Sequence, residues 1–120
     1  MTTCYDSKNV FAKILRGEIP CQKIYEDEFC LAFHDISPIA PTHALIIPKS
    51  AYINMYDFNE KATAVEIVGF YKGINKVIKL LNLNENGFRV VSNCGSHGEQ
   101  AVPHYHLHIL GGRPLGAIAG

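Results

Sequence analysis

Three histidines alternate along a short segment near the end of the chain. His104, His106 and His108 lie in the sequence PHYHLHIL, residues 103 to 110. In an extended strand, successive side chains point to opposite faces, so the three imidazoles share one face at intervals of about 7 Å. The residues between them are apolar or aromatic and point to the other face. The pattern predicts a strand with a core on one side and three imidazoles on a solvated or ligand-facing surface.

Three kinds of chemistry fit this spacing. Structural histidines on a polar face are one, although three in alternation, out of six in the chain, are hard to obtain by chance. A metal site is the second, because imidazole is a ligand of zinc and copper, but no Cys, Asp or Glu stands at short spacing. The third is transfer at phosphorus. Imidazole, with a free pKa of about 6.5, is largely neutral at pH 7 and can act as a nucleophile.

Transfer at phosphorus fits the segment best. Neighbouring imidazoles can donate hydrogen bonds to phosphate oxygens or hand a proton to a leaving group. The middle histidine is flanked on both sides, which suits it to the attacking role. The preceding loop, residues 93 to 103, contains Gly95 and Gly98, and its backbone N–H groups could form an anion-binding nest.

Composition limits the remaining possibilities. The chain has 120 residues, which suits one domain, and its 48% hydrophobic and 18% charged residues are typical of globular proteins. Eleven basic residues balance eleven acidic ones, so attraction to nucleic acid or to an anionic membrane is not indicated. No stretch is apolar enough to span a bilayer, and the N-terminus does not resemble a secretory signal. Four cysteines without a C-x-x-C pair favour free thiols and a location in the cytoplasm or in an organelle matrix, and we expect the cytoplasm.

The hydrophobic patterns and turn residues predict an α+β fold with a mainly antiparallel sheet of five strands. We expect the short helix to be capped by Ser7 and to end at Gly17, and the long helix to begin with a capping box of Asp57 and Glu60. The expected elements are a short helix at 7–20, strands at 22–27, 30–36 and 43–49, a long helix at 57–82, and strands at 88–93 and 104–110.

The sequence resembles the histidine-triad (HIT) family. HYHLHIL matches the His-x-His-x-His-x-x signature with apolar x, and the resemblance reaches most of the chain. The segments RGEIP, YEDEFCLAFHDISPIAPTHALIIPK, GFRVVSN and GEQAVPHYHLHILGGR are similar to the nucleotide-binding branch of that family. The resemblance implies one HIT domain over residues 1–120 and a homodimer in which two five-stranded sheets join.

The resemblance also implies an enzyme that needs no cofactor or metal. The expected reaction is hydrolysis of purine nucleoside phosphoramidates, such as adenosine monophosphoramidate, through a nucleotidyl-histidine intermediate that yields AMP or GMP. His106 corresponds to the nucleophile, His108 to the residue that hydrogen-bonds the phosphate and assists proton transfer, and His104 and His43 to residues that orient the nucleophile. The alternative is a nucleotide-binding regulatory module with weak or incidental hydrolase activity.

Further positions match the family's substrate site. Asp35 matches the acceptor of the ribose hydroxyls, although an isolated Asp before Ser37 could equally cap a turn. The positions that match the base pocket could otherwise belong to the core or to the proline bend; they are Phe33, His34, Ile36 and Leu45. The positions that match the loop beside the phosphate are Asn93, Glu99, Gln100, Ala101 and Val102.

The chain departs from many relatives in two places. A zinc site built from two cysteines, a later histidine and the first triad histidine is replaced by Asn9, Ala12 and Ala51, with only His104 remaining. We therefore expect no zinc there. Near the phosphate, Ala101 stands where relatives often carry serine, and Glu99 where they often carry glycine. Both changes are expected to affect turnover or leaving-group preference.

Overall fold

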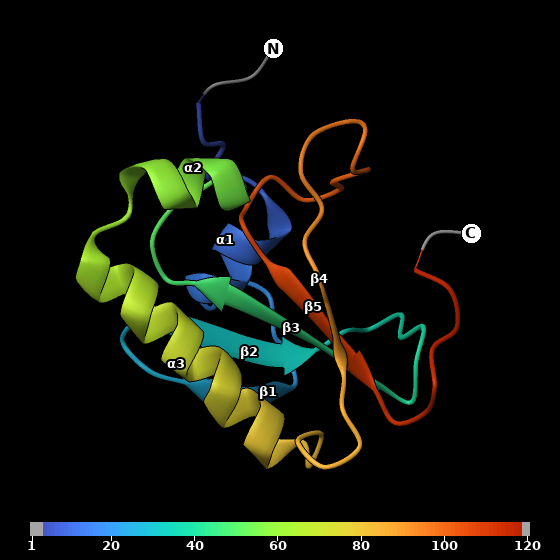
Figure 1. Cartoon of the computed structure of the whole chain (residues 1–120). Helices are drawn as coiled ribbons and strands as arrows, with labels where there is room; N and C mark the ends of the chain where they lie inside the picture. The colour runs from blue at the N-terminus through green and yellow to red at the C-terminus, as the bar shows by residue number, and fades with distance from the viewer. Residues whose placement is uncertain (1–3, 119–120) are drawn as a thin grey trace.

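The computed structural model describes residues 4–118 and shows an antiparallel sheet of five strands with helices packed against it (Figure 1). The strand order across the sheet is β1-β2-β3-β5-β4, and every neighbouring pair is antiparallel. In chain order the elements are α1 (Val10–Leu15), β1 (Lys23–Glu26), β2 (Cys30–His34), β3 (Thr42–Pro48), α2 (Met55–Lys61), α3 (Ala64–Leu80), β4 (Arg89–Val91) and β5 (Leu107–Gly111). The predicted α+β class and sheet are confirmed. None of the described helices is long and apolar enough to cross a membrane.

Apolar side chains cover both faces of the sheet. In Figure 1, α3 crosses in front of the sheet and α1 lies behind it. The larger cluster, on the α3 side, includes Phe70, Ile74 and Val77 together with Tyr105, Leu107 and Ile109. The residues between the triad histidines therefore face the core, as the alternation predicts. The smaller cluster joins Phe11 of α1 to four side chains on the opposite face: Leu31, Phe33, Leu45 and Ile47.

The predicted long helix is wrong, because two helices occupy its place. The Ala62 backbone is extended, with ψ of 147°, and separates α2 from α3. The Thr63 side chain accepts from the Glu66 backbone N–H, and the Glu66 side chain accepts from the Thr63 N–H. This reciprocal cap starts α3, whereas Asn54 caps α2, so the expected Asp57–Glu60 box does not form.

The short helix and the last strand are both shorter than predicted. Asn9, not Ser7, caps α1, which ends at Leu15. The last strand begins at Leu107, so His104 and His106 precede it. The backbone N–H of Tyr105 donates to the carbonyl of Tyr52 at 2.7 Å and not to a strand. Side-chain alternation continues through this segment even though strand pairing does not, which explains why the sequence pattern overestimates the strand.

Candidate active site

Strand pairing brings together histidines that are far apart in the sequence. His43 lies on β3 and His108 on β5, and the two strands are neighbours in the sheet. Their rings meet, with His43 Nε2 2.9 Å from His108 Nδ1. Asp35 follows β2 and lies with its Oδ2 3.3 Å from His43 Nε2. The sheet thus brings together two histidines on neighbouring strands and the aspartate that directly follows β2.

Backbone groups determine where the protons of this group lie. The Ile39 N–H donates to His43 Nδ1 at 3.1 Å, so this nitrogen carries the lone pair and His43 Nε2 carries the hydrogen. His43 Nε2–H therefore donates to His108 Nδ1, and Asp35 Oδ2 lies close to the same hydrogen. It follows that the proton of neutral His108 is on Nε2.

His106 is held in the opposite tautomer. Its Nδ1 lies 2.7 Å from the main-chain carbonyl of His104, which can only accept, so Nδ1 carries the hydrogen. Its Nε2 is left with the free lone pair. The ring meets Phe11 edge-on, with centroids 4.9 Å apart, and lies 5.2 Å from the ring of His108. His106 thus offers a nucleophilic nitrogen beside a histidine that offers an N–H donor.

The histidines are more buried than the sequence suggests. The sequence predicted three imidazoles on a solvated or ligand-facing surface. His43, His104 and His106 are buried and His108 is half-buried, so the triad does not lie on a solvated surface. Burial lowers the pKa of His43, His104, His106 and His108, because the charged form loses its hydration. The pKa of His104 falls to about 4, and that of His108 also falls to about 4, helped by neighbouring His106 and His43. All four rings are therefore neutral at pH 7.

His104 is anchored at both ring nitrogens. Its Nε2 lies 2.9 Å from the Pro48 carbonyl, and its Nδ1 lies 2.5 Å from the hydroxyl of Tyr5. The ring is completely buried. His104 is therefore held at both ring nitrogens and closed to solvent.

Asp35, His43 and His108 also form the geometric outline of a cation site. One ligand atom from each lies within 4.8 Å of the others. No acidic residue is close to the triad in the sequence, but the fold brings Asp35 next to His43 and His108. However, the hydrogen on His43 Nε2, fixed by Ile39, occupies the nitrogen that a cation would need. The group as arranged is a hydrogen-bonded set and not a ligand set.

The residues at the positions of the relatives' zinc site do not fit zinc. The Asn9 side chain accepts from the Ala12 N–H and donates to the Asp6 carbonyl, so it is committed to capping α1. Ala12 and Ala51 offer no ligand atom. Both ring nitrogens of His104 are already hydrogen-bonded, Nδ1 to the Tyr5 hydroxyl and Nε2 to the Pro48 carbonyl.

The predicted base-pocket residues divide into two groups. Phe33 and Leu45 are buried in the cluster behind the sheet, where Val102 also packs. His34 is exposed, and Ile36 is 96% exposed. Asp35 has two roles, because its Oδ1 accepts from the Ser37 N–H, as a turn cap does, while Oδ2 faces His43.

The loop before the triad is tied down by two side-chain amides. Asn93 donates to the Gly98 carbonyl, whereas Gln100 accepts from the Gly95 N–H and donates to the carbonyls of Ile53 and Val102. Glu99 and Ala101 are exposed, and Glu99 has a φ of 55°. Glu99 therefore occupies a left-handed conformation that favours glycine.

Sequence reasoning missed three contributors to the site. Tyr5 bonds to His104, Phe11 packs on His106, and the Ile39 N–H sets the tautomer of His43. In the sequence, Phe11 has only the pattern of an apolar residue in a short helix. Ile39 follows Pro38 in the bend. Its position four residues before His43 is the only feature of the sequence that indicates a contact between its N–H and that histidine. Tyr5 lies 99 residues from His104 and carried no local signal.

Comparison with known proteins identifies the family. The model of the HIT domain family matches residues 16–115 of this chain. The chain belongs to the HIT domain family. Solved structures of similar proteins share the fold: a HIT family hydrolase from Clostridium thermocellum is 40% identical, with a TM-score of 0.85 over 95% of this chain and 98% of that one.

Two curated relatives span nearly the same length. A HIT-like protein of 13.2 kDa from Azospirillum brasilense is 53% identical over 118 residues, which is 98% of this chain and 97% of that one. The purine nucleoside phosphoramidase of Escherichia coli is 41% identical over 112 residues, which is 92% of each chain. The family membership expected from the sequence is confirmed.

Proposed function

We propose that the protein is a hydrolase that cleaves the P–N bond of purine nucleoside phosphoramidates by way of a nucleotidyl-His106 intermediate. The observation that carries the proposal is the tautomer of His106. Its Nδ1–H is bound to the His104 carbonyl, and its Nε2 lone pair is free. The similarity to the Escherichia coli phosphoramidase supports the choice of substrate class.

The proposed reaction has two steps. His106 Nε2 attacks the α-phosphorus, a P–Nε2 bond forms, the P–N bond to the amine breaks, and the departing amine takes up a proton that originates in solvent. Water then attacks the phosphorus, the P–Nε2 bond breaks, and the proton returns to solvent. The sum is the addition of one water across the P–N bond, which gives a nucleoside monophosphate and an amine.

The neighbouring residues are assigned supporting roles in this scheme. His108 Nε2–H donates to a phosphoryl oxygen and assists proton transfer, because its Nδ1 is already bound to His43. Asp35 binds the ribose hydroxyls, and the exposed Ile36 with His34 meets the base above the buried Phe33 and Leu45. Asn93 and the loop from Glu99 to Val102 border the phosphate.

The test is intact-protein mass after a rapid quench from adenosine phosphoramidate. We expect the wild type to gain one adenylyl group transiently, and His106→Asn to gain none while it still binds AMP. His97→Asn is the matched control, because His97 is an exposed histidine in the preceding loop. AMP binding by the wild type without adduct or product would favour the alternative, a nucleotide-binding regulatory module.

We also propose that two copies of the chain pair through β4. We propose further that each copy is a single domain and that the protein works in the cytoplasm. The sheet has two open edges, β1 and β4. Strand β1 carries the Lys23–Glu26 ion pair, and charges discourage edge pairing. At the β4 edge, by contrast, Phe88 and Val90 are exposed. The cytoplasmic location rests on the four free cysteines.

Sedimentation velocity tests the pairing. We expect a dimer for the wild type and a monomer for Val90→Lys, because an ammonium group at the joined edge would lose its hydration. Val10→Lys, on the exposed side of α1, is expected to leave the dimer unchanged. A wild-type monomer at micromolar concentration would refute the pairing.

A further inference from the structure

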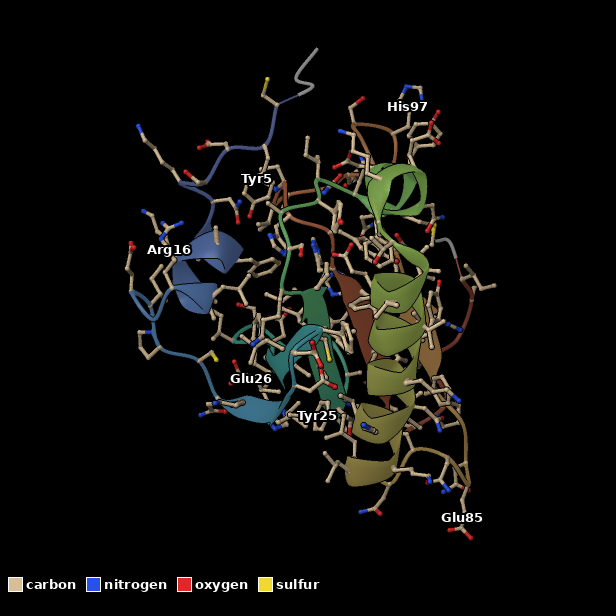
Figure 2. All side chains as sticks on the ribbon, turned by 90° about the vertical axis from the view of Figure 1, so that its left-hand side faces the viewer. Tyr5, Arg16, Tyr25, Glu26, Glu85 and His97 are labelled. Atoms are coloured by element: carbon tan, nitrogen blue, oxygen red, sulfur yellow. The ribbon has the colours of Figure 1, made fainter. Side chains whose placement is uncertain are left out.

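The N-terminal segment reaches the first histidine of the triad. The hydroxyl of Tyr5 lies 2.5 Å from His104 Nδ1, and the two rings meet edge-on with centroids 5.5 Å apart. Figure 2 shows Tyr5 on the segment that leads into α1. Two residues separated by 99 positions are thus joined by a direct hydrogen bond.

The direction of this hydrogen bond follows from the other side of the ring. The Pro48 carbonyl can only accept, so His104 Nε2 carries the hydrogen that the 2.9 Å contact requires. In the neutral ring Nδ1 then holds the lone pair, and the Tyr5 hydroxyl is the donor. Without that hydroxyl, a completely buried ring nitrogen would lose its hydrogen-bond donor.

The orientation of His104 matters because its backbone holds His106. The His104 carbonyl accepts from His106 Nδ1–H at 2.7 Å, and this bond leaves the lone pair on Nε2. Both residues precede β5, so strand pairing does not fix the His104 carbonyl. The Tyr105 N–H, which lies in the same peptide plane as that carbonyl, donates to the Tyr52 carbonyl. The ring of His104, anchored at Tyr5 and Pro48, is a second restraint on this stretch of backbone.

The same hydroxyl is not needed to hold the N-terminal segment itself. The Asp6 carbonyl accepts from both the backbone and the side chain of Asn9, and Arg16 donates to the Ser7 carbonyl. These bonds attach the segment to α1 independently of Tyr5. The contact between Tyr5 and His104 therefore serves the triad more than the segment.

We propose that Tyr5 is a positioning residue that fixes the ring of His104 and thereby keeps the nucleophilic lone pair of His106 on Nε2. This inference rests on the proposed function, since it assigns Tyr5 to the same site. The Tyr5 hydroxyl thus anchors the first triad histidine at Nδ1.

The test compares Tyr5→Phe with Tyr25→Phe. Each variant loses one tyrosine hydroxyl bond, because Tyr25 donates to Asp27 at 2.7 Å, and Figure 2 shows Tyr25 far from Tyr5. We expect Tyr5→Phe to lower kcat about two- to twelve-fold, the range that one hydrogen bond supports, with KM and AMP affinity unchanged. Tyr25→Phe is expected to leave kcat unchanged.

Imidazole ¹⁵N NMR provides a second measurement that does not depend on turnover. In the wild type the His106 signals should report a hydrogen on Nδ1 only, and in Tyr5→Phe they should report a mixture of tautomers. If Tyr5→Phe retains both the wild-type kcat and the wild-type His106 signals, the inference is wrong. If the wild type has no turnover, the proposed function fails, and the tautomer comparison alone still decides the role of Tyr5.

Discussion

Main-chain groups set the chemistry of the individual histidines. His43 takes its tautomer from the Ile39 N–H, His106 from the His104 carbonyl and His104 from the Pro48 carbonyl. A backbone N–H can only donate and a backbone carbonyl can only accept, so each of these contacts is compatible with only one tautomer of the neutral ring. The three triad histidines therefore differ in their states. His104 is bonded at both ring nitrogens, His106 keeps a free lone pair on Nε2, and His108, whose Nδ1 is bonded to His43, presents Nε2–H.

Glu99 is the residue where this chain conflicts most with its proposed substrate. Its φ of 55° strains a side chain with a Cβ, and its carboxylate lies on the loop assigned to the phosphate. We expect Glu99→Gly to raise the free energy of unfolding by up to about 1 kcal/mol and to lower KM for a phosphoramidate several-fold at low salt. Urea unfolding and steady-state kinetics at two salt concentrations measure the two effects.

Two further variants separate backbone strain from charge. Apart from glycines, Glu99 and Asn82 are the residues with positive φ in the described part of the chain, and the φ of Asn82 is 57°. Asn82→Gly should relax the backbone at the end of α3 without changing KM. Glu99→Gln should lower KM without stabilising the fold. An unchanged KM in both Glu99 variants would show that this carboxylate does not face the substrate.

At the scale of elements, the sequence predicted faces better than boundaries. The alternation in HYHLHIL correctly placed Tyr105, Leu107 and Ile109 in the core, because burial follows side-chain direction. It could not show that strand pairing begins only at Leu107, since pairing depends on β3 and β4. The apolar stripe at 57–82 likewise continued through the break at Ala62, because both helices bury a face against the same sheet.

The break between α2 and α3 gives a prediction about capping. Thr63 and Glu66 satisfy each other's backbone N–H groups, and Tyr52 donates to the Glu66 carboxylate. Thr63→Ala should therefore lower the free energy of unfolding by about 1 kcal/mol. Glu60→Ala, at the position of the capping box expected from sequence, should change it by less than about 0.5 kcal/mol. Equal effects in chemical denaturation would mean that the helix starts elsewhere.

For the whole molecule, the site depends on contacts between distant parts of the chain. Local patterns could identify the triad and the helix faces, but the N-terminal Tyr5, the bend at Ile39 and the aspartate after β2 meet the histidines only once the sheet has formed. Such contacts leave no periodic signal in the sequence. Their main consequence is burial of the imidazoles, which no pattern predicted and which couples the stability of the fold to pH.

The direction of this coupling follows from the lowered pKa values. The pKa of His104 is about 4 in the folded chain and about 6.5 when unfolded, so between these values only the unfolded chain binds the proton. Stability from this group is complete above about pH 6.5 and is lost as the pH falls toward 4. From pH 7.5 to pH 5, His104 alone should lower the free energy of unfolding by about 2 kcal/mol, and His108 acts in the same direction. Urea unfolding at the two pH values measures the loss. Equal stability at both pH values would mean that His104 is protonated in the folded protein, and the neutral ring that anchors the triad would have to be abandoned.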